Sequence, residues 1–267
     1  MFDSMEYLEI LLWALIPSAL YAIVLWSLDH KRPKLLPMLL LFLTGAILVV
    51  PCYIVEYVMD MVFPWGSSGH LLLNILPSAI LEEGAKLLCL VFAFRVFLGK
   101  HDRWQYFFTS GFILGSGFMF METFVYMVEY GDIYFVQDNK TYLVELTDPL
   151  FGGIVGIGLF LILKGKWRHA LLYILPPVAL HFCHNMGVIV LGDVPWWPIY
   201  FAAYILALLF FAREYICMYI DTLCVSLSAQ EIHRADQTVS VPGNAKRLLG
   251  LKNVWKDFRQ ANLGKNK

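Results

Sequence analysis

The sequence predicts an all-α protein, a polytopic membrane bundle of about seven transmembrane helices. Apolar residues make up 59% of the chain and charged residues 15%, against about 45–50% and about 25% in soluble domains. The apolar residues also gather in stretches of about 18 or more, long enough as helices to cross a hydrocarbon core of about 30 Å. This composition excludes a disordered chain and an ordinary cytosolic enzyme. A formal net charge of −1 gives no reason to expect nucleic acid as a partner.

Seven apolar stretches are the expected spans, taken in chain order. They comprise residues 7–27, 36–63, 71–98, 106–130, 149–164, 170–191 and 197–219. Of the 20 Lys and Arg residues, 18 lie on one side of a seven-span arrangement, in the loops after the first, third and fifth spans, at the adjoining span ends, or from Arg213 onward, and Lys140 is the one basic loop residue on the other side. The positive-inside rule therefore predicts an external N-terminus and a cytoplasmic C-terminus.

The chain is expected to divide near residue 220. Residues 1–220 form the predicted transmembrane domain, and residues 221–267 form a polar, basic cytoplasmic tail. Within the tail, apolar residues recur at helical spacing between Lys and Arg residues, at Leu248, Leu251, Val254, Trp255 and Phe258. This pattern is typical of an amphipathic helix on an anionic membrane surface. A solvated basic tail is the alternative.

Ionisable residues inside the spans are candidate functional residues, because a charge at the bilayer centre costs at least about 2.5–3.5 kcal/mol. The third span contains Glu82 and Glu83, followed by Lys86. On a helix Lys86 shares a face with Glu82 and also reaches Glu83, while the two carboxylates point about 100° apart. One carboxylate can then be paired while the other faces a cavity. A buried ion pair with a second, protonated Glu is the structural alternative.

The fourth span carries a close-packing motif and an acidic residue. Gly111 and Gly115 form a GxxxG face that lets another helix approach closely. Phe118, Glu122 and Tyr126 follow at intervals of four residues, so Glu122 is expected to face the bundle. A buried Glu that accepts a hydrogen bond from a neighbouring hydroxyl is the alternative.

The sixth span contains His181, His184 and Asn185 at spacing i, i+3 and i+4, which turns all three toward one side of the helix. Two His with an Asn at this spacing are a moderately specific metal-site pattern. Pro176 and Pro177 are expected to break or bend the helix one turn earlier.

Asp148 lies at the start of the fifth span, where a helix cap needs no further function. It shares a helix face with Gly152 and Gly156, so this helix is expected to pack tightly just below Asp148.

Carboxylates and imidazoles that converge inside a bundle can bind a divalent metal and activate water. The motifs Glu82-Glu83-x-x-Lys86, Phe118-x-x-x-Glu122 and His181-x-x-x-Asn185, in this order on successive spans, resemble the PrsW family of intramembrane metalloproteases. That family is related to the CAAX-protease and bacteriocin-processing group. The resemblance covers about residues 70–190, and Asp148 stands where the family pattern usually has a His.

The resemblance implies a metal-dependent endopeptidase of the bacterial plasma membrane. Its substrate would be a membrane-anchored protein, such as an anti-sigma factor, cleaved near the outer face of the lipid bilayer. The implied cofactor is a divalent metal, with zinc as the expected ion. The resemblance implies that Glu82 and Glu83 are the general base and its electrostatic partner, with Lys86 holding one of them. Glu122, Asp148 and His181 would form the metal- or water-binding shell. Asn185 would be a supporting or oxyanion donor, and His184 is a further ligand candidate.

Two other function classes remain open from the residues alone. A proton- or cation-coupled transporter or channel could use the same acidic residues as a relay. A catalytically inactive scaffold could keep the fold and bind a partner helix, and Asp148 in place of His keeps this alternative open. The sequence shows no internal repeat, which counts against a transporter built from two related halves. It leaves the oligomeric state undetermined.

Overall fold

The computed structural model describes residues 4–28, 34–62, 74–99, 101–130 and 147–191, and within these ranges it contains helices and no strand. The helices are α1 (Ser4–Leu28), α2 (Leu35–Val62), α3 (Leu76–Ala93), the short π-helix η2 (Phe94–Leu98), α4 (Trp104–Tyr130), α6 (Thr147–Leu163) and α7 (Trp167–Leu191). The predicted all-α class is confirmed for this part of the chain. The first six predicted spans each coincide with a helix to within five residues at either end. The predicted span 197–219 and the tail 221–267 lie outside the described residues.

Among the described residues, three helical segments are long and apolar enough to cross a membrane, namely Met5–Ser27, Leu35–Val62 and Trp104–Glu129. The helix Thr147–Leu163 is also apolar but shorter. These helices make the protein a multi-pass membrane protein. All the described residues belong to one compact unit, Met1–Ile205.

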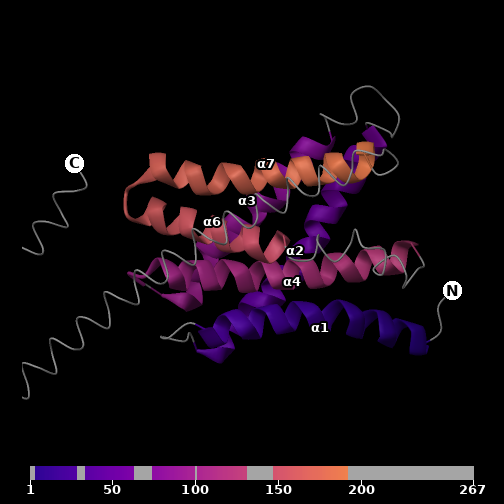
Figure 1. The fold of residues 1–267 in the computed structure, drawn as a ribbon, viewed down its shortest axis with the longest axis horizontal. Coiled ribbons are helices and arrows are strands. Elements are labelled where there is room, and N and C mark those ends of the chain that lie inside the picture. Colours follow the sequence, from indigo (N-terminus) through magenta and orange to yellow (C-terminus); the bar gives the residue numbers. More distant parts are fainter. Residues whose placement is uncertain (1–3, 29–33, 63–73, 100, 131–146, 192–267) are drawn as a thin grey trace, which may run out of the picture. The chain divides into compact units, whose positions relative to one another are not determined.

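Helix α4 is the central helix of the described bundle, in contact with α1, α2, α3 and α6. Figure 1 shows α1, α4, α6 and α7 side by side in that order. Helix α3 packs against α2, α4, α6 and α7. Residues from α3, α6 and α7 can therefore meet at one place.

Glycines bring α4 and α6 into backbone contact. A Cβ atom at Gly111 would collide with the carbonyl oxygen of Gly152, and a Cβ atom at Gly152 would collide with that of Gly111. In the same way, Gly115 lies against the backbone of Asp148, and Gly156 lies against the backbone of Phe107. The close approach predicted from the glycine spacing of both helices is confirmed, and it fixes where Asp148 lies.

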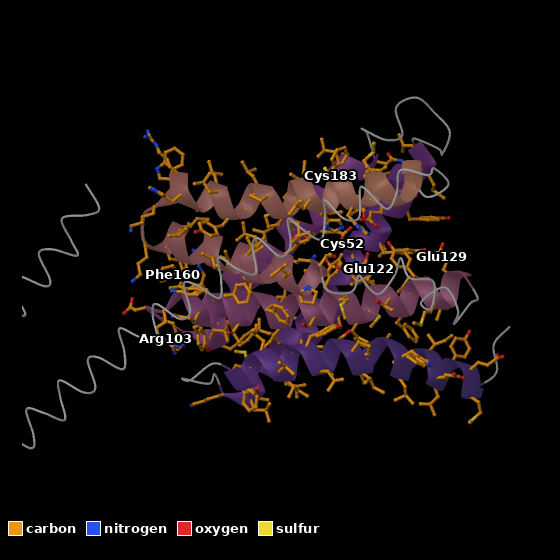
Figure 2. All side chains as sticks on the ribbon, viewed as in Figure 1. Cys52, Arg103, Glu122, Glu129, Phe160 and Cys183 are labelled. Carbon is orange, nitrogen blue, oxygen red and sulfur yellow. The ribbon has the colours of Figure 1, made fainter. Side chains whose placement is uncertain are left out.

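The two ends of the bundle differ in character. The end where α6 finishes and α4 begins is filled by an apolar core that includes Leu90, Phe107, Leu114 and Val155. The buried ionisable residues gather toward the other end. In Figure 2, Phe160 and Glu129 lie near opposite ends of the bundle, and Glu122 lies nearer to Glu129.

A tight hairpin joins α6 to α7. Gly165 has φ of +73°, and the amides of Gly165 and Lys166 donate to the carbonyls of Ile162 and Leu161. These two bonds are those of a Schellman motif, in which glycine accepts the left-handed conformation at low cost. Beside the hairpin, Lys164 pairs with Asp102 at 2.6 Å.

Helix α7 runs without interruption through both of its internal prolines, Pro176 and Pro177. Of the predicted break or bend at these prolines, the break is therefore wrong. Consecutive prolines remove two backbone donors, but a helix tolerates such losses where neighbouring helices pack around it.

Candidate metal centre

The ionisable residues converge from helix segments that lie toward one end of the bundle. Glu82 is in the second turn of α3, and Asp148 is in the first turn of α6. Glu122 precedes the end of α4 at Tyr130 by eight residues, which is about 12 Å at 1.5 Å per residue. His181 comes from α7. The centre is therefore off the middle of the bundle, toward the end where α3 and α6 begin.

Three side chains form a group that could hold a metal ion. One ligand atom from each of Glu82, Asp148 and His181 lies within 4.8 Å of the other two. All three residues are buried, with 3–6% of their surface exposed. Residues from three separate helices thus bring two carboxylates and an imidazole together inside the bundle.

The two ring nitrogens of His181 face different carboxylates. Nδ1 lies 3.0 Å from Glu83 Oε1, within hydrogen-bond distance. Nε2 lies 3.7 Å from Glu82 Oε2. If Nδ1 carries the hydrogen and donates it to Glu83, the lone pair of Nε2 is directed toward Glu82. A carboxylate that orients an imidazole in this way is the usual support of a metal-binding His.

Lys86 is fully buried among these acidic residues. Its Nζ lies 2.8 Å from Glu83 Oε1 and also pairs with Asp148 Oδ1. The Nζ atom is 4.4 Å from the centre of the Phe118 ring. The sequence allowed Lys86 to pair with Glu82 or Glu83 on its own helix, and in the structure it pairs with Glu83. It also pairs with Asp148, which is 62 residues further along the chain.

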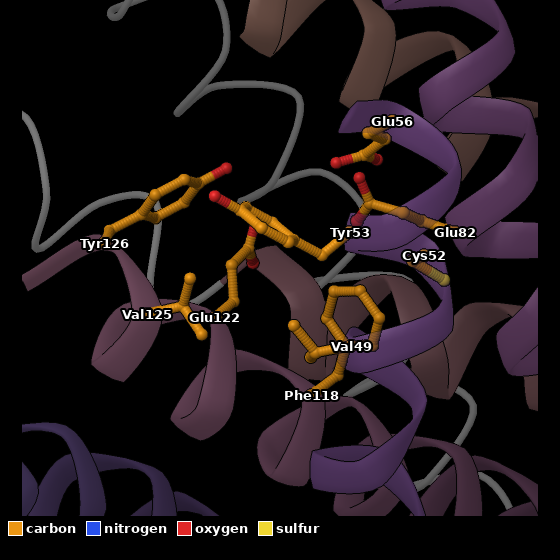
Figure 3. Close-up of a pocket in the computed structure, with 9 residues that line it drawn as sticks. All are labelled: Val49, Cys52, Tyr53, Glu56, Glu82, Phe118, Glu122, Val125 and Tyr126. Atoms are coloured by element: carbon orange, nitrogen blue, oxygen red, sulfur yellow. The ribbon is translucent and has the colours of Figure 1, made fainter. Parts of the chain in front are cut away.

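Glu122 of α4 lies close to Asp148, outside the three-residue group. Tyr126, one turn further along α4, lies close to Glu122. Both residues line a small, partly open pocket between α2, α3 and α4. Figure 3 shows Glu82 at this pocket as well, together with Glu56 of α2.

Glu56 and Ser78 are site residues that sequence analysis missed. Ser78 Oγ hydrogen-bonds to Glu56 Oε1 and lies 3.2 Å from Glu82 Oε1. An acidic residue inside the second apolar span was the available signal for Glu56. Ser78 gave no signal, because a helical serine often bonds only its own backbone.

The remaining predicted site residues follow His181 on α7. His184 is buried one turn beyond His181, and Asn185 is half-buried. Neither belongs to the group of Glu82, Asp148 and His181. The resemblance had implied that Glu82 is the general base or its electrostatic partner, and not a metal ligand.

The donor atoms of the group fit a divalent metal. Among the described residues, Glu82 Oε2 and Glu83 Oε2 are buried and have no hydrogen-bond partner. Buried carboxylate oxygens need such a partner or a cation. Carboxylate oxygen and imidazole nitrogen are the donors found in catalytic zinc sites with three protein ligands.

The helices and the buried carboxylate and imidazole groups define a class of protein: a polytopic membrane protein with an internal site suited to a metal. The model of the PrsW family of intramembrane metalloproteases matches residues 33–212. The chain belongs to this family, and the resemblance seen in its motifs is confirmed. Comparison with curated proteins and with solved structures gives no match. The protein is an intramembrane metallopeptidase, which acts on membrane proteins in a lipid environment with a divalent metal.

Proposed function

We propose that Glu82, Asp148 and His181 hold a zinc ion, and that the enzyme cleaves a membrane-anchored protein, such as an anti-sigma factor. The observation that carries this proposal is the convergence of the three ligand atoms within 4.8 Å. When bound, the metal would polarise the scissile carbonyl and make water a better nucleophile.

The other polar residues have roles that follow from their contacts. Glu83 orients the His181 ring through Nδ1. Lys86 holds Glu83 and Asp148 in place and balances their charge. Because Glu83 Oε1 is already engaged by both Lys86 and His181, Glu83 serves better as a support than as a base.

Glu122 is the carboxylate that we assign as general base. It lines the pocket and is not part of the ligand group. Its carboxylate would take the proton of the attacking water and pass it to the leaving nitrogen. Asn185 is the candidate donor to the carbonyl oxygen in the transition state, and His184 remains a further ligand candidate.

We also propose seven spans, with an external N-terminus and a cytoplasmic C-terminus in a bacterial plasma membrane. The bias of Lys and Arg toward one side supports this orientation. Under it, the end of the bundle nearer the metal group is the outer end, so cleavage takes place near the outer face. A reporter fused after Lys267 is then cytoplasmic, and one inserted after Asn139 is external. The opposite result for either fusion would refute the orientation.

The metal content and proteolysis of the purified protein test the proposed site. The wild type is expected to contain one zinc per chain and to cleave a single-span anti-sigma factor. Glu82→Gln keeps the shape of the side chain but removes its charge, so it is expected to lose both properties. Glu129→Gln is the matched control, because Glu129 is a carboxylate that bonds Tyr53 outside the metal group. A folded wild type without metal or proteolysis would favour the inactive scaffold, and metal-independent cation flux would favour the transporter.

A further inference from the structure

The pocket that Glu82 and Glu122 share has an apolar side as well as an acidic one. Its lining includes three carboxylates and three apolar side chains, namely Glu56, Glu82 and Glu122 and Val49, Phe118 and Val125. In the view of Figure 3, these apolar side chains lie below the three carboxyl groups. A peptide held at Glu82 and Glu122 for cleavage therefore has an apolar surface beside it.

The spacing of the helices at the apolar side of the pocket is fixed by backbone contact between α2 and α4. A Cβ atom at Gly45 of α2 would collide with the carbonyl oxygen of Leu114, and one at Gly117 of α4 would collide with that of Phe42. Val49 follows Gly45 by about one turn of α2. Because protein interiors are close-packed and yield little, the side chains that line the pocket determine its size.

The pocket has room for a small group only. Its free volume is about 20 Å³, and about 10–15 Å³ on the same measure admits one water molecule. A methyl group is of similar size, whereas the side chains of Leu, Phe, Lys and Arg are much larger. An acidic side chain would lie beside three other carboxylates, and like charges repel. The side chain that the pocket fits is therefore small and apolar, as in alanine.

We propose that this pocket is the subsite for a small apolar side chain next to the scissile bond, and that Val125 is its specificity-determining residue. The inference rests on the proposed function, because it requires Glu82 and Glu122 to act at that bond. Val125 follows Glu122 by three residues, so both share a face of α4. Successive residues of an extended peptide are about 3.3 Å apart, so a residue that flanks the scissile bond lies within reach of this wall.

Cleavage of a single-span anti-sigma factor by the full-length enzyme in detergent tests this role, once mass spectrometry has located the cleaved bond. Two substrate series carry Ala or Leu at one or the other of the residues that flank this bond. The measured quantity is the ratio of kcat/KM for Ala to kcat/KM for Leu. The wild type is expected to prefer Ala about 10-fold or more at one of the two positions, since a single methylene in an apolar pocket changes kcat/KM by about 10- to 200-fold.

Three variants change this ratio in different ways. Val125→Ala enlarges the pocket and is expected to lower the preference for Ala about 10-fold. Val125→Leu fills it and should lower kcat/KM for the Ala substrate by a similar factor. Val128→Ala is the matched control, because Val128 is also half-buried on α4 but packs against Ile10 and Met127. Its ratio should remain that of the wild type.

A variant on the other helix keeps the test decisive if Val125→Ala does not fold. Val49→Ala enlarges the same pocket from α2 and is expected to lower the ratio in the same direction. Zinc affinity, measured by competition with a chelating dye, should stay that of the wild type in Val125→Ala, because Val125 is not in the ligand group.

The outcomes separate this inference from the proposed function. Equal cleavage of the Ala and Leu substrates by the wild type at both positions would refute the subsite. An unchanged ratio in folded Val125→Ala, or an equal change in Val128→Ala, would refute the role of Val125 while cleavage and zinc binding stand. A wild type that neither binds zinc nor cleaves the anti-sigma factor would refute the proposed function, and the subsite with it.

Discussion

Replacing Gly115 with alanine tests how the contact between α4 and α6 positions Asp148. The new Cβ atom would lie 2.8 Å from the carbonyl carbon of Asp148 and 2.9 Å from Cα of Pro149, and closer still to the Asp148 carbonyl oxygen. Ordinary van der Waals contacts of a Cβ atom begin at 3.4 Å. The neighbouring atoms are backbone atoms, so no side chain can rotate away to make room.

The size of the effect follows from this distance. The carbonyl carbon must move by at least about 0.6 Å, the difference between 3.4 Å and 2.8 Å. Overpacking of this kind costs about 1–3 kcal/mol of stability. A metal site tolerates ligand displacements of only about 0.2 Å, so zinc affinity should fall by at least the roughly 10-fold seen when supporting residues are lost.

Thermal unfolding and zinc affinity, measured on the same purified variants, separate the two effects. Gly156→Ala is the first control, because its Cβ atom would meet the backbone of Phe107, about 12 Å along α6 from Asp148 at 1.5 Å per residue. It should lose stability but keep most of the zinc affinity. Gly84→Ala, with no atom within 4 Å of the new Cβ, should lose neither. If Gly115→Ala binds zinc as tightly as Gly156→Ala does, the contact does not position Asp148.

Three further predictions concern stability, each measured as thermal unfolding of the purified protein in detergent. Asp148→Ala removes one of the two carboxylates on the fully buried Lys86 and should cost about 3–5 kcal/mol; Lys86→Met in the same chain should recover much of this loss, and no recovery would contradict the ion pair's role. Gly165→Ala forces a side chain to φ of +73° and should cost about 1–2 kcal/mol, so an unchanged midpoint would refute the strain. The hydrogen bond and charge of Lys164 lower the pKa of Asp102. The ion pair between Lys164 and Asp102 therefore stabilises the folded state above about pH 4, the usual pKa of Asp. This contribution disappears as the pH falls through the lowered pKa. Asp102→Asn should therefore be slightly less stable than the wild type at pH 7 and equal to it at low pH, whereas a difference that grows on acidification would contradict this sign.

The features that depend on local periodicity could be predicted from the sequence. Apolar length alone located six helices to within five residues at each end, because a helix that crosses lipid must satisfy its own backbone. The glycine faces of the fourth and fifth spans were also predictable, since a spacing of four residues places Gly111 with Gly115 and Gly152 with Gly156. The contact between these two faces could not be predicted, because residue spacing identifies a helix face and not the helix that packs against it.

The parts of the centre that join separate helices could not be predicted. Sequence spacing placed Lys86 beside Glu82 and Glu83, and its contact with Asp148 emerged only from the packing of α3 against α6. Glu56 was passed over for the same reason, since a single acidic residue in an apolar span has no visible partner until α2 lies against α3. The prolines of α7 were expected to break or bend the helix, and they do not break it because tertiary packing overrides a local rule.

The fixed ammonium group of Lys86 has a consequence for which ions the centre can accept. Glu82, Glu83, Asp148 and the neighbouring Glu122 bring four negative charges when all are ionised, and Lys86 returns one positive charge, which leaves a net charge of −3. A divalent cation reduces this sum to −1 and a monovalent cation only to −2, and each uncompensated charge costs several kcal/mol away from water. The charges of the centre therefore favour a divalent ion over a monovalent one. Lys86 sets how much negative charge an ion must balance, because without its ammonium group the same carboxylates would carry one further uncompensated charge.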